Sequence, residues 1–158
     1  SSVAFSPDGE YILTGSYDKT VRVWATFSGK LVKTFTFYGK VSSIAFSPDG
    51  TRIAVGDDSG NTSFFLANSF EPLHTSYVTH PFRAILGIAF SPDGKWLITG
   101  SEGGDIFVWA AKDEKLRQKF RGIFKSRYSK KVPIEDIYSV EVLAGGKRVL
   151  TGSCDNEA

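Results

Sequence analysis

The sequence predicts an all-β protein built from repeated four-stranded antiparallel units. The first unit opens with Ser-Val-Ala-Phe, followed by Ser-Pro-Asp-Gly at 6–9 and the apolar run at 11–16. The same order returns twice almost verbatim, and a diverged copy begins near residue 139. The four copies start 41, 44 and 52 residues apart, at Ser2, Ser43, Gly87 and Ser139. A period of about 40–45 residues with strand-length apolar runs indicates one propeller blade per repeat.

The first repeat shows how each element is predicted. Val3 and Phe5 alternate with small residues, as in a half-buried strand. In the turn at 6–9, proline presets φ, aspartate bonds the following backbone and glycine accepts a left-handed conformation. A second turn opens at Asp18 and a third is Ser-Gly-Lys at 28–30. Four strands are therefore expected near 2–6, 11–16, 21–26 and 31–36.

The other repeats follow the same pattern with local changes. We assign blade one to 1–37, blade two to 41–79 and blade three to 85–121, followed by a basic insertion at 122–136 and a half blade at 137–158. The outer strands of blades two and three are expected at 73–78 and 115–120. Proline and glycine recur too often, and the apolar period is 2, so no helix is expected in residues 1–120.

Composition narrows the class of protein. Hydrophobic residues make up 41% and charged residues 23%, which is typical of a globular protein. No apolar run approaches the roughly 20 residues of a membrane span, and no signal-peptide pattern opens the chain. A single cysteine rules out an internal disulfide and fits a reducing compartment, so we expect a cytoplasmic protein. The net charge of +2 is too small to indicate a nucleic-acid partner.

The last unit has only two strands, so we expect the chain to be a segment of a longer protein. A blade buries its faces only against neighbouring blades. Exposing even about 300 Å² of apolar face costs roughly 7 kcal/mol, comparable with the stability of a whole domain. We therefore expect that residues 1–158 alone are not a stable monomer. The remaining blades, or another chain, would have to cover the open ends.

These residues resemble the WD-repeat β-propeller family over the whole chain. Ser16, Asp18, Thr20 and Trp24 match the family pattern in repeat one, and Trp109 matches it in repeat three. In the family such residues form a buried hydrogen-bonded set, so the resemblance implies that Asp18 and Trp24 are buried structural residues. Alanine follows both tryptophans and Phe65 replaces the tryptophan of repeat two, so only part of the set is expected. The resemblance also implies a ring of about seven blades.

No residue is assigned a catalytic or metal-binding role, and no cofactor is expected. His80 and His74 are interpreted as structural, because a base needs a nucleophile or carboxylate in reach. Asp57-Asp58 with Asn61 lacks the closing glutamate of a calcium loop and is interpreted as a turn capped by its own carboxylates. The glycines at 145–146 lack phosphate-loop spacing, and Cys154 has no histidine at readable spacing.

Nine lysines and arginines lie between Lys112 and Lys131, opposed by Asp113 and Glu114 alone. At 115–119 they alternate with less polar residues, as on a solvated edge strand. At 121–131 a solvated loop and a site for phosphates or an acidic protein surface remain equally open. We expect residues 123–133 to form an exposed positive lobe, with Lys125, Arg127, Lys130 and Lys131 as candidate partner contacts.

The family resemblance implies a non-enzymatic scaffold that binds a partner protein through rim loops. The face concerned is made by the turns after each second strand and the connectors before each first strand. On this chain it offers Tyr17, Ser42, Asp58, His80, Phe82, Arg83, Leu86, Glu102 and Tyr138. The alternatives are a sensor propeller fused to an NTPase or kinase and, third, a propeller enzyme.

Overall fold

The structure is a computed structural model that describes residues 2–77, 83–121, 136–143 and 148–153. Within these residues all regular structure is β-strand, arranged as three four-stranded sheets and one two-stranded sheet. Blade one contains β1 (Ser2–Phe5), β2 (Tyr11–Gly15), β3 (Thr20–Ala25) and β4 (Leu31–Thr36). Blade two contains β5 (Val41–Phe46), β6 (Arg52–Asp57), β7 (Asn61–Leu66) and β8 (Pro72–Tyr77). Blade three contains β9 (Ile85–Phe90), β10 (Trp96–Ser101), β11 (Asp105–Ala110) and β12 (Lys115–Arg121), and the fourth sheet pairs β13 (Ile137–Val142) with β14 (Val149–Ser153).

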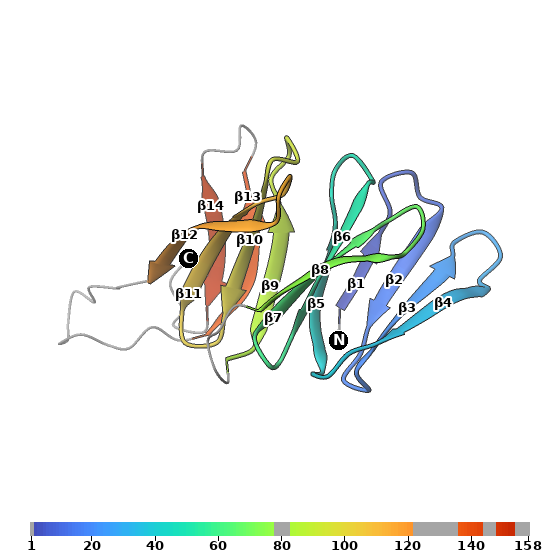
Figure 1. The fold of residues 1–158 in the computed structure, drawn as a ribbon, viewed down its shortest axis with the longest axis horizontal. Helices are drawn as coiled ribbons and strands as arrows, with labels where there is room; N and C mark the ends of the chain where they lie inside the picture. The colour runs from blue at the N-terminus through green and yellow to red at the C-terminus, as the bar shows by residue number, and fades with distance from the viewer. Residues whose placement is uncertain (1, 78–82, 122–135, 144–147, 154–158) are drawn as a thin grey trace.

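The predicted fold class is confirmed. Every sheet is antiparallel with its strands in chain order, and the strand bounds in blade one lie within one residue of the predicted ones. The outer strand of blade two begins one residue earlier than predicted, and that of blade three ends one residue later. Figure 1 shows the four sheets side by side in chain order, with their strands running between two ends of the molecule.

The first strands of the four sheets, β1, β5, β9 and β13, lie next to one another. Gly87 of β9 shows how close two of them come. A Cβ added there would lie 3.1 Å from the Val140 backbone nitrogen and 3.2 Å from the Ser139 carbonyl carbon. Backbone atoms move aside less easily than a flexible side chain, so a methyl group at this position would strain the contact between the two strands.

The Ser-Pro-Asp-Gly turns close the first hairpin of three sheets in the same way. In blade one the Ser6 hydroxyl donates to Asp8 Oδ1 at 2.5 Å and accepts the Tyr11 N–H at 2.9 Å. Asp8 Oδ1 also accepts the Glu10 N–H at 2.9 Å, and Gly9 has a φ of 74°. The equivalent bonds recur in blades two and three. This repeated network explains why the motif predicts the hairpin so well.

The hydrophobic core lies between the sheets. Leu13, Val21 and Val23 of blade one pack against Ile53 and Phe65 of blade two. The next cluster joins blades two and three, and a third joins blade three to the two-stranded sheet. Each sheet thus buries an apolar face against its neighbour.

A glycine near the end of each second strand lets the next sheet approach. A Cβ on Gly15 would lie 2.5 Å from Val41 Cγ1, and one on Gly56 would lie 2.6 Å from Ile85 Cγ2. The third case is Gly100, where the distance to Ile137 Cγ2 would be 2.7 Å. The β-branched residue that begins each first strand therefore occupies the space that the glycine leaves open.

A polar contact and an aromatic contact each join two neighbouring blades at the end that carries the Ser-Pro-Asp-Gly turns. Arg52 of blade two forms an ion pair with Glu114 of blade three at 2.8 Å and also donates to the carbonyls of Ala111 and Lys112. Glu114 has a φ of 55° and is buried. The equivalent turn of blade two instead places Phe70, also at φ 55°, edge-on to Tyr11 of blade one at 5.4 Å.

Because Gly56 leaves space for Ile85, we predict that substitutions at these two positions have coupled effects on stability. Gly56→Ala should lower the free energy of unfolding of the full-length protein by about 1–3 kcal/mol, because the new methyl group overpacks against Ile85. In an Ile85→Ala background the same change should cost less, since the nearest atom, Ile85 Cγ2 at 2.6 Å, is gone, although the Cβ at 2.9 Å remains. Urea titration of the four proteins measures this coupling. Strict additivity would contradict the proposed contact.

The turn networks predict a stability difference that depends on pH. Hydrogen bonds from the serine hydroxyl, then from a backbone N–H, lower the pKa of Asp8, Asp49 and Asp93. A carboxylate with a lowered folded pKa stabilises the fold above its unfolded pKa of about 3.9 and loses this effect as the pH falls through the folded pKa. Replacing Ser6, Ser47 and Ser91 by alanine should therefore lower Tm most above about pH 5. Thermal melts of the full-length protein from pH 7 to pH 3 test this, and a difference that is constant with pH would refute it.

Candidate partner-binding face

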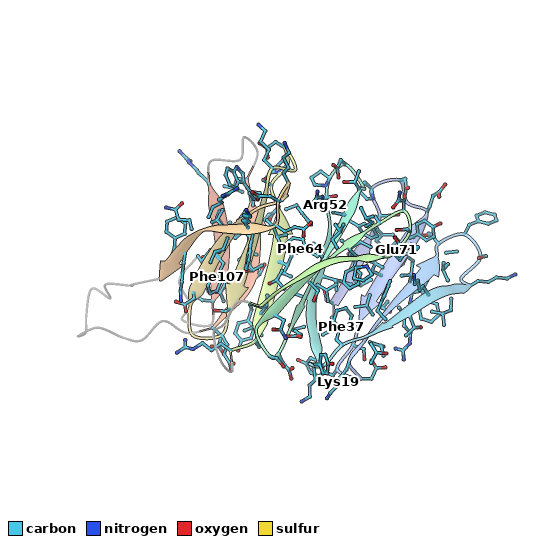
Figure 2. The ribbon with its side chains drawn as sticks, in the orientation of Figure 1. Lys19, Phe37, Arg52, Phe64, Glu71 and Phe107 are labelled. Atoms are coloured by element: carbon cyan, nitrogen blue, oxygen red, sulfur yellow. The ribbon has the colours of Figure 1, made fainter. Side chains whose placement is uncertain are left out.

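The turns after the second strands and the connectors before the first strands lie at one end of the molecule. We call this end the turn–connector face and define it, within the described residues, by 16–20, 37–42, 57–61, 83–86, 101–105 and 136–138. Figure 2 places Lys19 and Phe37 at this end and Arg52 towards the opposite end. The sequence prediction for partner binding concerns this face.

The turn of blade one is held by its own polar side chains. Asp18 accepts hydrogen bonds from the Thr20 N–H at 3.0 Å, from the Thr20 hydroxyl at 2.6 Å and from Arg22 at 2.7 Å. The Ser16 hydroxyl accepts the Asp18 N–H at 3.1 Å. The bonds from Thr20 and then Arg22 hold the pKa of Asp18 well below its usual range.

The predicted burial of Asp18 is wrong, because 45% of its side chain is exposed. Its carboxylate bonds Thr20 and Arg22 at the start of β3, at the protein surface and not inside the blade. Trp24 is half-buried, and its indole N–H donates to the Thr14 hydroxyl at 2.9 Å. Trp109 makes the same bond to Thr99 at 3.2 Å and is buried. The sequence interpretation did not identify Thr14 and Thr99 as partners of the tryptophans, although Thr-Gly-Ser recurs at 14–16 and 99–101.

The turn of blade two holds its carboxylate at a different position. Asp57, at the place of Ser16, is 3% exposed and accepts the N–H groups of Ser59 and Asn61, each at 2.9 Å. Its second oxygen accepts the Asn61 side-chain amide at 2.9 Å. The turn is thus capped by its own aspartate, as the sequence predicted. Among the described residues no three His, Cys, Asp or Glu side chains form a group that could hold a metal ion.

Asp58 and Glu102 have a role that the sequence did not reveal, because each binds the connector beside it. Asp58 Oδ1 accepts the Lys40 N–H at 2.8 Å, and the Asp58 N–H donates to the Lys40 carbonyl at 2.9 Å. In blade three the Ala84 N–H donates to Glu102 Oε2 at 3.4 Å, and the Glu102 N–H donates to the Ala84 carbonyl at 2.9 Å. Both carboxylates remain exposed and also fix the backbone.

The turn of blade three is also bonded by a residue that precedes the blade and by one that follows it. Arg83 donates to the carbonyls of Glu102 and Gly103 at 3.4 and 3.3 Å, and its guanidinium lies over Gly103. The Gly103 N–H donates to Asp136 at 2.8 Å, and the Tyr138 hydroxyl lies 3.4 Å from the other oxygen of that carboxylate. Asp136 was not among the predicted site residues, because its role depends on a turn 33 residues away.

The remaining candidates differ in accessibility. Tyr17 is 65% exposed and Tyr138 is 55% exposed, and the Lys40 ammonium lies 5.8 Å from the Tyr17 ring centroid. Ser42 is half-buried and donates to the carbonyls of Gly56 and Ile85, while Leu86 is half-buried on β9. The other predicted contacts lie outside the described residues: His80, Phe82, Lys125, Arg127, Lys130 and Lys131.

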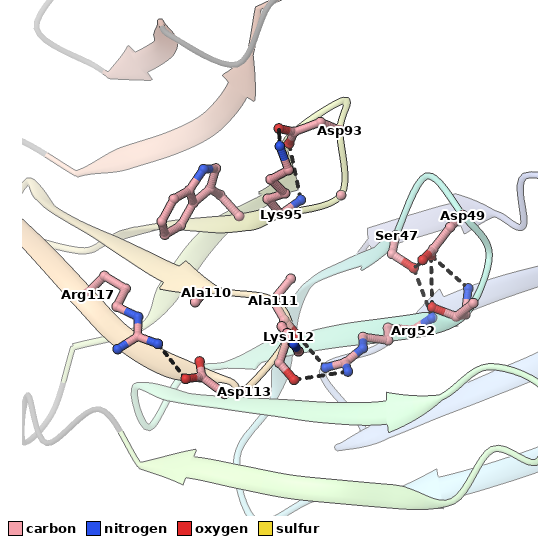
Figure 3. Close-up of a pocket in the computed structure, with 13 residues that line it drawn as sticks. Ser47, Asp49, Arg52, Asp93, Lys95, Ala110, Ala111, Lys112, Asp113 and Arg117 are labelled. Carbon is pink, nitrogen blue, oxygen red and sulfur yellow. Dashed lines mark hydrogen bonds and ion pairs between the residues drawn. The ribbon is translucent and has the colours of Figure 1, made fainter.

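The opposite end carries a cleft of about 640 Å³ between blades two and three. In its wall Asp113 pairs with Arg117, and Asp93 pairs with Lys95 at 3.5 Å (Figure 3). Arg52 bonds the turn carbonyls beside it. Since these charges neutralise one another within the wall, this cleft is a weaker candidate than the turn–connector face.

The repeated four-stranded sheets pack their apolar faces together, and their first strands lie side by side. This arrangement is that of β-propeller blades, so the chain is a repeat protein of the β-propeller class. The family described as WD domain, G-beta repeat matches residues 1–25, 29–65 and 70–110, which is more than half of the chain. The chain therefore belongs to the WD-repeat family, whose members generally mediate protein–protein interactions and are generally non-catalytic.

One curated relative is ribosome assembly protein 4 of Saccharomyces cerevisiae. It is 48% identical over 33 residues, which are 21% of this chain and 6% of the relative. The chain thus matches only a small part of that protein's length. Separately, none of the described residues form a helix long and apolar enough to cross a membrane.

The Asp58–Lys40 contact predicts a specific change in hydrogen exchange. Asp58→Ala removes the acceptor of the Lys40 N–H, and a bond to a charged group contributes about 1.5–3 kcal/mol, so exchange at Lys40 should accelerate at least about tenfold. Hydrogen exchange of the full-length protein, read on peptides covering 38–42, measures this. Asp113→Ala is the control, because its carboxylate pairs with Arg117 in blade three and not with the connector. Equal acceleration in both variants would show that the effect is not local.

Proposed function

We propose that the chain is part of a non-catalytic scaffold that binds a partner protein through the turn–connector face. The observation that carries this proposal is the set of exposed tyrosine rings on a hydrogen-bonded backbone. Tyr17, Tyr38 and Tyr138 are 65%, 91% and 55% exposed. Tyrosine is enriched in protein interfaces, where a large ring held by few rotatable bonds gives contact area at low entropic cost.

The backbone that presents these rings is fixed before a partner arrives. Asp58 and Glu102 bond the connectors, and Asp136 bonds the turn of blade three. A face ordered in advance loses less conformational entropy on binding than a flexible loop does. This favours a binding surface over a merely solvated end of the fold.

Two further parts of the proposal concern the partner and the place of action. Lys125, Arg127, Lys130 and Lys131 would extend the contact towards an acidic partner surface. An intracellular, cytoplasmic protein is supported by the single cysteine and by the relative named for ribosome assembly. The similarity to a ribosome assembly protein also fits a scaffold that takes part in building a larger complex.

A pair of matched variants tests the proposal. The full-length protein would be purified from cells as wild type, as Tyr17→Ala/Tyr138→Ala and as Phe27→Ala, and the proteins that co-purify would be quantified by mass spectrometry. Phe27 is the control, because it is fully exposed in the turn between β3 and β4 and lies outside the turn–connector face. We expect the double variant, but not the control, to lose a partner by at least about tenfold, since interface aromatics dominate affinity.

Binding would then be repeated with the purified partner and the same variants. A further variant with Lys125, Arg127, Lys130 and Lys131 changed to Glu measures the contribution of the basic residues. If the double variant keeps the affinity of the wild type for every partner, the turn–connector face is not the binding site.

A further inference from the structure

A cavity of about 310 Å³ lies between the outer strands of blades one and two. Four of its nine lining residues are aromatic, and its polar side chains come from β4, from the connector after it, from the end of β6 and from β7. No lysine, arginine or histidine contributes to the lining, which consists of Phe35, Thr36, Phe37, Tyr38, Asp57, Asn61, Ser63, Phe65 and Pro72. Phe35 and Phe37 both contact the Phe65 ring, at centroid distances of 5.0 and 5.8 Å. The cavity is therefore aromatic and carries one negative charge.

That charge is the buried carboxylate of Asp57. Its three hydrogen bonds all come from neutral donors, two backbone N–H groups and the Asn61 amide. Within the described residues no cation lies within ion-pair distance of it. A buried charge is costly unless it is paired, and neutral donors compensate only part of the cost. Asp57 is thus a site that an incoming cation would stabilise.

Blade three shows what occupies the equivalent place when the chain supplies its own cation. The Lys119 ammonium lies 3.2 Å from Asp105 and 5.1 Å from the centroid of the Phe107 ring. Asp105 and Phe107 stand at the β11 positions that correspond to Asn61 and Ser63 of β7. A cation between a carboxylate and an aromatic ring is therefore already part of this architecture.

Blade two differs at all three of these positions, with Asn61 in place of Asp105, Ser63 in place of Phe107 and Thr75 in place of Lys119, and its buried carboxylate is Asp57. Ser63 replaces the bulky Phe107, which leaves the cavity open. The strand register pairs Phe107 with Lys119 in blade three, but Ser63 with Thr75 in blade two. The cation is thus absent from the strand position where blade three carries it. Lys33 does not replace it, because its ammonium bonds the carbonyls of residues 69 and 70 and does not line the cavity.

We infer that this cavity binds a basic side chain, arginine or lysine, of a partner polypeptide. The cationic head group would pair with Asp57, and its methylene stem would pack on Phe37 and Tyr38. The inference rests on the proposed function, since Tyr38 belongs to both the cavity and the turn–connector face. It adds the chemistry of the partner: a protruding basic residue that reaches between two blades.

Ligand-observed NMR of the full-length protein tests this with three capped tripeptides, Gly-Arg-Gly, Gly-Lys-Gly and Gly-citrulline-Gly. Citrulline has the shape of arginine without its charge. We expect saturation transfer to the side-chain methylenes of at least one basic peptide and about tenfold weaker binding of the citrulline peptide, because the ion pair is missing. The stronger basic peptide identifies the head group. Equal binding of all three peptides, or no binding of any, would overturn the inference.

Two variants locate the binding. Asp57→Asn should weaken the basic peptides about tenfold, whereas Asp113→Asn, which changes an exposed carboxylate of blade three outside the cavity, should not. Because Asp57→Asn also disturbs the turn, Thr75→Lys provides an independent test. It places a lysine at the register position of Lys119, and should block the peptides while leaving Tm unchanged or raised. Undiminished peptide binding in Thr75→Lys would refute the location.

These measurements use no natural partner, so they are separate from the test of the scaffold proposal. If the peptides do not bind but the tyrosine variant loses its partner, the scaffold proposal stands and the cavity has no part in it. If the peptides bind and no partner depends on the tyrosines, the cavity recognises basic residues and the proposed face is wrong.

Discussion

The close approach of neighbouring sheets is the constraint on which the rest of this structure depends. Gly15, Gly56 and Gly100 each leave space for a β-branched residue at the start of the next blade. This contact fixes where each first strand begins, and hence where the connector before it must run. The turn–connector face is therefore a direct consequence of how the sheets pack, because its hydrogen bonds join each connector to the turn of the same or the preceding blade.

The strands could be predicted from sequence because their turns have strong local chemistry. Serine, aspartate and glycine of the Ser-Pro-Asp-Gly motif act within six residues of one another, so a short stretch of sequence contains the whole network. The burial of Asp18 was predicted from the family pattern and is wrong. Its partners Thr20 and Arg22 are just as local, but no spacing rule says whether a turn ends inside or outside a blade.

The candidate site was only partly predictable, because its contacts join distant parts of the chain. Asp58 and Lys40 are 18 residues apart, and Asp136 bonds a turn 33 residues away. The ion pair between Arg52 and Glu114 spans 62 residues. Repeat alignment placed Asp58 and Glu102 on the turn–connector face, but it could not show that their carboxylates bind the connectors. Such pairs depend on how two sheets pack, which periodicity does not specify.

Comparison of the blades shows that the same backbone conformation can carry different side chains. Three turns of the same outline each hold an aspartate at a different position: Asp18 in the first, Asp57 in the second and Asp105 in the third. Each carboxylate is compensated differently, by Arg22, by neutral donors and by Lys119. The residues common to all repeats determine the backbone conformation. The other positions can therefore vary without loss of the fold. Blade two departs from blade three at Ser63 and Thr75, which replace Phe107 and Lys119, and this is where we infer room for specific recognition.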